Sequence, residues 1–142
     1  MKAEHILQAK GAAVFSVQAA DTISKAISVL NDKNIGAVIV QDASEKVVGI
    51  LSERDIVRHM GARGAEVLTM KVSECMTPDP ITCAADVSVD ELMAKMTEKR
   101  VRHLPVTQDK KIVGVVSIGD VVKRKIEQAE QEAQALKDYI AS

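Results

Sequence analysis

Hydrophobic residues recur at helical spacing in two stretches of the chain, residues 23–30 and 89–96. In both stretches the apolar positions follow i, i+3, i+4 and i+7, the pattern of a helix with one buried face. Thr22 and Ser88 stand directly before these stretches, where an N-cap residue belongs. Ser88 with Glu91 also has the spacing of a capping box. The sequence therefore predicts a helix beginning after each of these caps.

Short runs of β-branched and aliphatic residues flank both predicted helices. A short strand is expected before each helix, and a hairpin of two strands separated by a polar loop after it. Second helices are expected to begin at Glu53 and Ile118, which gives the order β-α-β-β-α in each half. Because proline cannot donate a ladder hydrogen bond, Pro105 predicts that its strand is an edge strand or irregular at that point. The expected strands cover residues 14–17, 35–40 and 46–52, then 81–82, 101–106 and 111–117.

The two halves are also similar in sequence. Gly49-Ile-Leu-Ser-Glu-Arg-Asp55 recurs 65 residues later as Gly114-Val-Val-Ser-Ile-Gly-Asp120. Each copy has only about 60 residues, which is marginal for an independent domain, so the copies are expected to fold against each other. We expect an α/β (α+β) fold of two repeats: 1–70 as the first with its N-terminal segment, 71–126 as the second with an extended linker, and 127–142 as a helical tail.

Composition excludes several classes of function. The net charge is −1, and Phe15 and Tyr139 are the only aromatic residues, so neither a nucleic-acid interface nor a base-stacking platform is expected. The longest apolar runs are too short to cross a bilayer, and residues 1–7 lack the pattern of a signal peptide. We therefore expect a cytoplasmic protein that does not enter membranes. Cys75 and Cys83 have neither redox-motif nor zinc-ligand spacing, which predicts free thiols.

Three features in register resemble paired cystathionine-β-synthase-type (CBS) domains, also called a Bateman module. They are Val72-Ser-Glu-Cys-Met-Thr77 before the second copy, Arg102-His-Leu-Pro-Val106, and Gly-x-x-Ser-x-x-Asp in both copies. The resemblance covers residues 3–126. It implies a pseudo-twofold pair with two clefts between the halves, which bind AMP, ATP, NAD(H) or S-adenosylmethionine, often as a regulatory part.

The chemistry of Ser52-Glu-Arg-Asp55 and Ser117-Ile-Gly-Asp120 permits two interpretations. Both follow a strand and open a helix, where free backbone N–H groups suit a phosphate and a carboxylate accepts hydrogen bonds from ribose hydroxyls. In the alternative interpretation, the serine only caps the helix and the aspartate only complements its dipole. Local spacing is the same in both cases.

The resemblance assigns roles to individual residues. Asp55 and Asp120 correspond to the family's ribose-binding aspartate, and Ser52 and Ser117 to the neighbouring hydroxyl residue. Arg102 and His103 correspond to residues placed against phosphates, but Gly36 and Ala37 occupy these positions in the first copy, and Arg54 has Gly119 as its counterpart. The two sites are therefore expected to differ in charge. The remaining candidates are the expected adenine contacts Ser16, Val17, Ile81, Thr82 and Cys83, with Pro105 beside the basic pair.

Beyond residue 122 the apolar and small positions continue in alternating steps of four and three to Ile140, which is a heptad pattern. We expect this tail to pack on its own module or to join two copies as a homodimer. No activated nucleophile, acid/base pair or metal cluster is evident, so an enzyme and a catalytic cofactor are not expected. The favoured function is a regulatory module that binds an adenine nucleotide, AMP, ATP or NAD(H), and the alternative is a structural dimerisation or interaction module. The sequence names no downstream protein target.

Overall fold

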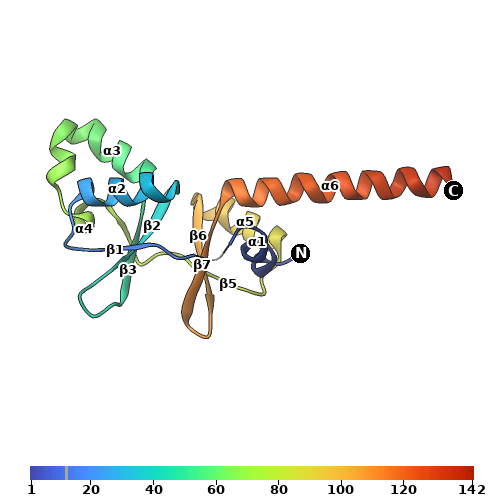
Figure 1. The fold of residues 1–142 in the computed structure, drawn as a ribbon, viewed down its shortest axis with the longest axis horizontal. Helices are drawn as coiled ribbons and strands as arrows, with labels where there is room; N and C mark the ends of the chain where they lie inside the picture. The colour runs from blue at the N-terminus through green and yellow to red at the C-terminus, as the bar shows by residue number, and fades with distance from the viewer. Residues whose placement is uncertain (12) are drawn as a thin grey trace. The chain divides into compact units, whose positions relative to one another are not determined.

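The computed structural model describes residues 1–11 and 13–142, which form two compact units (Figure 1). The first unit is Ala13–Ile81, and the second combines residues 1–11 with Thr82–Ser142. The first contains β1 (Ser16–Gln18), α2 (Ile23–Lys33), β2 (Ala37–Gln41), β3 (Val47–Ser52), α3 (Glu53–Arg63), the 3-10 helix η1 (Gly64–Thr69), α4 (Val72–Cys75) and β4 (Thr77–Pro78). The second contains α1 (Ala3–Lys10), β5 (Cys83–Ala84), α5 (Val89–Lys99), β6 (His103–Gln108), β7 (Lys111–Ser117) and α6 (Ile118–Ala141). The expected mixed α/β class and the order of elements are confirmed.

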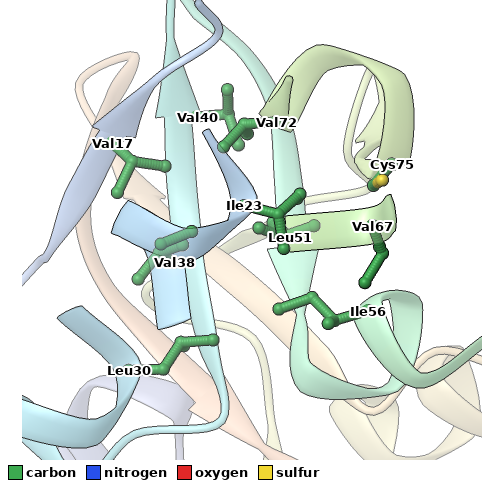
Figure 2. Close-up of a cluster of buried hydrophobic side chains, with 11 residues drawn as sticks. Val17, Ile23, Leu30, Val38, Val40, Leu51, Ile56, Val67, Val72 and Cys75 are labelled. Carbon is green, nitrogen blue, oxygen red and sulfur yellow. The ribbon is translucent and has the colours of Figure 1, made fainter. Parts of the chain in front are cut away.

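The sheet of the first unit has the strand order β1-β2-β3-β4. β1 runs parallel to β2, and β2 forms the predicted antiparallel hairpin with β3. One face of the sheet packs against α2, where Ile23 and Ala26 are fully buried, as their spacing predicts. Figure 2 shows this core, which is aliphatic apart from one thiol: Val17, Ile23, Leu30, Val38, Val40, Leu51, Ile56, Val67, Val72 and Cys75.

The helix caps are formed largely as predicted. The Thr22 side chain accepts a hydrogen bond from the Lys25 N–H, and that of Ser88 accepts one from the Glu91 N–H. In the described part of the chain, Ser88 and Glu91 form only this one of the two bonds of the expected capping box. The Ser88 backbone also forms a β-bridge with Lys2.

The sheet of the second unit repeats this topology with strand order β5-β6-β7. Pro105 was expected on an edge strand or at an irregularity. The first alternative is wrong, because β6 is the central strand, and the second agrees with the ladder that β6 forms with β5. That ladder begins only at Cys83 and Val106, one residue past the proline. At the corresponding place in the first unit, Ile39 donates its N–H to the Phe15 carbonyl at 3.0 Å. Proline has no N–H to donate, which explains why β5 is shorter than β1 and starts later than expected.

A short helix covers each sheet, and these helices do not follow the expected domain boundaries. In the second unit, the first residues of α1 donate to the carbonyls of Val87 and Ala85; in the first unit, the first residues of α4 donate to those of Asp21 and Ala19. The Val87 carbonyl of the second repeat corresponds to the Asp21 carbonyl of the first, and the Ala85 carbonyl corresponds to that of Ala19. The linker segment thus completes the first unit and the N-terminal segment completes the second, which differs from the expected division at 70/71.

α6 is the longest helix and has two different parts. Its first turns pack on the second unit and bury Val121 completely. From Ala129 onward, every residue is exposed. No helix in residues 1–11 and 13–142 combines the length and the apolar character that crossing a membrane requires.

Candidate functional site

Both Ser-x-x-Asp motifs form complete capping boxes. In α3 the Asp55 N–H donates to Ser52 Oγ at 3.2 Å, and the Ser52 N–H donates to Asp55 Oδ2 at 2.9 Å. In α6 the same two bonds join Ser117 and Asp120, at 3.1 and 2.9 Å. Each serine therefore caps its helix, and each aspartate completes the cap. This arrangement leaves Oδ1 of each aspartate without a hydrogen bond in the described residues, in an orientation that the cap fixes.

In the first unit, the hairpin places the expected neighbours beside this helix start. Ala37 pairs with Ser52, and the Gly36 carbonyl accepts the Glu53 N–H at 2.9 Å. Ser16 pairs with Ile39, two residues along β2 from Ala37, and its side chain is exposed. These residues therefore lie around the open end of α3.

Three further predicted site residues of the first unit differ in burial and in their position in the unit: Val17, Arg54 and Ile81. The Val17 side chain is buried in the core, so only its main chain is available to a ligand. Arg54 is exposed and has no ion pair or side-chain hydrogen bond among residues 1–11 and 13–142. Ile81 is partly buried and lies outside the strands, at the end of the first unit.

The second unit has the same arrangement with basic residues in place of small ones. His103 pairs with Ser117, and the Arg102 carbonyl accepts the Ile118 N–H at 2.8 Å. Arg102 is exposed, whereas His103 is partly buried and engaged in an interaction. Gly119 is exposed in the first turn of α6. The two helix starts therefore differ in the side chains that lie beside them.

The expected adenine contacts of the second unit are partly occupied. The Thr82 carbonyl accepts a hydrogen bond from the Lys95 ammonium, and the Cys83 carbonyl accepts one from the Thr107 hydroxyl. The Cys83 side chain is buried, and burial raises the pKa of its thiol. Pro105 is buried within β6. A ligand that reaches these carbonyls must share them with the side chains already bound there.

Asp120 has a partner that the sequence did not predict. Lys10, the last residue of α1, places Nζ 2.6 Å from Asp120 Oδ2 and 3.0 Å from the Val115 carbonyl oxygen. Burial acts to raise the pKa of Asp120, but the hydrogen bonds from Lys10 and from the Ser117 N–H outweigh it and lower that pKa below its ordinary value. No described lysine or arginine pairs with Asp55 in this way. The two aspartates therefore share a backbone setting but differ in electrostatic setting.

A small pocket of about 90 Å³ adjoins Asp120. This volume is below the roughly 300 Å³ at which pockets for whole small-molecule ligands begin, so it suits one small group. Both α1 and α6 contribute to it. Its lining residues are Ile6, Ala9, Lys10, Asp120, Lys123, Arg124 and Glu127.

Comparison with known proteins identifies the family of the chain. A family model described as the CBS domain matches residues 12–62 and 72–127, which are the two repeats. The chain belongs to the CBS-domain family. As a tandem CBS pair it is a regulatory module, which confirms the resemblance and the repeat organisation read from the sequence.

Relatives and solved structures agree with this assignment. The chain is 36% identical over 124 residues to the CBS domain-containing protein CBSX3, mitochondrial, from Arabidopsis thaliana; the match covers 84% of the chain and 60% of that relative's length. The crystal structure of the CBS-domain containing protein ATU1752 from Agrobacterium tumefaciens is 39% identical, with a TM-score of 0.83 over 87% of this chain and 92% of that one. The CBS domain pair of protein MJ0100, solved in complex with 5′-methylthioadenosine and S-adenosyl-L-methionine, is 25% identical, with a TM-score of 0.75 over 87% and 98%.

Proposed function

We propose that this CBS pair senses the adenine nucleotide pool by binding AMP, ATP or NAD(H) at its two Ser-x-x-Asp helix starts, and that it catalyses no reaction itself. The observation that carries the proposal is the geometry of Asp55 and Asp120. In each, the cap holds one carboxylate oxygen and leaves the other unbonded in the described residues. Such a fixed acceptor next to the positive end of a helix suits a ribose hydroxyl with a phosphate nearby.

The complex of MJ0100 supports the class of ligand. That CBS pair binds two molecules that each contain adenosine. Adenosine supplies the ribose diol that a carboxylate recognises, whichever group is attached to its 5′ carbon. We extend to this chain the adenosine part of the ligand, and we assign the nucleotide class from the basic residues Arg54 and Arg102 beside the two helix starts.

A second function, structural association, is favoured by the exposed part of α6. Leu136, Tyr139 and Ile140 are 59, 79 and 74% exposed, on a helix whose apolar positions follow a heptad pattern. We propose that two copies associate through this tail as a homodimer. In a purely structural module the tail would be the whole function, and the helix starts would bind nothing. A cytoplasmic location remains our prediction.

Calorimetric titration with AMP, ATP, NAD(H) and S-adenosylmethionine, on protein stripped of ligand, tests the sensor function. Asp55→Asn and Asp120→Asn are the informative variants, because asparagine keeps an oxygen for the cap but loses the charge and the second acceptor. At least one of them should weaken nucleotide binding ten-fold or more, about 1.4 kcal/mol.

Thr22→Ala is the matched control, because it removes a helix cap in the first unit that is remote in sequence from either motif. It should lower stability by about 1 kcal/mol and leave affinity unchanged. A nucleotide at one hundred times its dissociation constant should stabilise the wild-type protein by about 2.7 kcal/mol. If none of the four ligands binds or stabilises the wild-type protein, the sensor function is wrong and the structural function is the one left to test.

A further inference from the structure

Lys10 forms an ion pair with Asp120, whose carboxylate binds the ribose in the proposed function. Its ammonium lies 2.6 Å from Asp120 Oδ2, the oxygen that also accepts the Ser117 N–H. Two donors on one oxygen leave little capacity there, whereas the corresponding oxygen of Asp55 accepts, from the residues that the structure describes, only the Ser52 N–H. An uncharged ribose that needs both oxygens of Asp120 must therefore compete with an ion pair.

The position of Lys10 results from the length of α1. α1 and α4 cover the two sheets with equivalent first turns, but α1 continues to Lys10 and α4 ends at Cys75. The additional turn of α1 brings the lysine to the start of α6. The first unit has no helical residue in the corresponding place, so this contact belongs to the second repeat alone.

The pocket beside the ion pair is cationic and has the size of a small anionic group. It is lined by three basic residues, Lys10, Lys123 and Arg124, and by two acidic ones, Asp120 and Glu127. Arg124 is already bonded to Glu127 at 2.8 Å and Lys10 to Asp120, whereas Lys123 has no ion pair among the described residues. One uncompensated positive charge thus remains. A volume of about 90 Å³ admits a phosphate group but not a nucleoside.

We infer that Lys10 makes the second-repeat site selective for phosphorylated adenosines over adenosine itself. When the site is empty, Lys10 neutralises Asp120. When a nucleotide binds, the ammonium exchanges the carboxylate for the phosphate, so the ion pair that is lost is replaced by another. Adenosine, or an adenosine carrying a cationic substituent, breaks the same ion pair without this replacement. The inference rests on the proposed function and adds a determinant of ligand class to one of its two sites.

AMP and adenosine form the test pair because they differ only in the phosphate. Calorimetry on Asp55→Asn protein isolates the second-repeat site. In that background, Lys10→Met keeps the aliphatic stem and removes the charge, and Lys10→Arg keeps the charge. Lys25→Met is the matched control, because it removes a lysine that pairs with an aspartate, Asp21, in the first unit.

We expect Lys10→Met to lower the ratio of AMP affinity to adenosine affinity at least ten-fold, through weaker AMP binding, equal or tighter adenosine binding, or both. Lys10→Arg should retain most of the ratio and Lys25→Met all of it. A ratio that stays within two-fold in Lys10→Met, while AMP still binds, overturns the inference and leaves the proposed function intact. An equal gain in affinity for both ligands also overturns it, because Lys10 would then be only a competitor. If neither ligand binds the wild-type protein, the proposed function fails and the inference fails with it.

Discussion

Replacing Gly49 by alanine tests whether the linker segment is built into the first unit. Gly49 lies in β3, where an added Cβ would be 2.6 Å from Met76 Sδ and 2.8 Å from the Thr77 carbonyl oxygen. Ordinary Cβ contacts begin at about 3.4 Å, so both atoms must move by more than half an ångström. The carbonyl belongs to the backbone of β4, which pairs with β3 at this point. The new methyl group therefore displaces a strand as well as a side chain.

The magnitude follows from two opposing effects. Overpacking of a well-packed site typically destabilises by about 1 to 3 kcal/mol, and displacement of backbone belongs at the upper end of that range. Replacing glycine by alanine in a strand returns about 0.5 to 1 kcal/mol by restricting the unfolded chain. We expect a net loss of about 2 kcal/mol for Gly49→Ala. Gly114→Ala should lose about 1 kcal/mol, because the three atoms nearest to its new Cβ, the first at 2.5 Å, all belong to the flexible Leu7 side chain and not to backbone.

Urea unfolding of the three variants Gly49→Ala, Gly114→Ala and Gly61→Ala measures these differences directly. Gly61 lies in α3, an added Cβ there meets nothing within 4 Å, and the substitution should stabilise by about 1 kcal/mol through helix propensity. From the highest urea midpoint to the lowest, the expected order is Gly61→Ala, wild type, Gly114→Ala and Gly49→Ala. If Gly49→Ala is as stable as Gly61→Ala, the linker does not pack on β3 and our account of the first unit is wrong.

Two further results are expected. Truncation after Glu127 removes the exposed part of α6 and should convert a dimer into a monomer in light scattering; a truncated chain that stays dimeric would place the interface elsewhere. Because the folded state lowers the pKa of Asp120, its ionised form contributes stability above the ordinary aspartate pKa of about 4, and this contribution is lost as the pH falls through the folded-state value. Urea unfolding between about pH 5 and pH 2 should therefore depend less on pH in Lys10→Met than in wild type, with Lys25→Met as control. Identical profiles would show that the Lys10–Asp120 ion pair does not form in solution.

Features encoded by neighbouring residues were predictable from the sequence. The caps at Thr22, Ser88, Ser52 and Ser117 formed because each serine or threonine lies three residues before the N–H that it accepts. Both hairpins appeared because alternating apolar runs flank a polar loop. The short strands were displaced by about two residues, because their ends are set by pairing with β2 and β6 and not by their own composition.

It was harder to predict that α1 covers the sheet of the second unit and that α4 covers the sheet of the first, although the sequence contained one signal of it. Met1-Lys2 recurs as Met70-Lys71, and these four residues occupy equivalent places: the carbonyls of Met1 and Met70 accept the first N–H of α5 and α2, and Lys2 and Lys71 form β-bridges with Ser88 and Thr22. The spacing is 69 residues rather than 65, so the match lies outside the main register. Even when it is noticed, it does not say which sheet each segment covers, because that depends on contacts between residues about 85 positions apart in the sequence.

The capping boxes show why Ser-x-x-Asp alone is a weak indicator of a ligand site. Both boxes use the same carboxylate oxygen at the same 2.9 Å, so the backbone geometry of the two helix starts cannot make them differ in what they bind. Any difference must come from the side chains around them. Arg54 stands beside one, whereas Arg102 and Lys10 stand near the other. Of these three, only Lys10 contacts the carboxylate, and it comes from a helix more than one hundred residues away in the sequence. In the proposed function, any difference in ligand between the two sites therefore comes from charges that the repeat does not duplicate, beside a backbone geometry that it does.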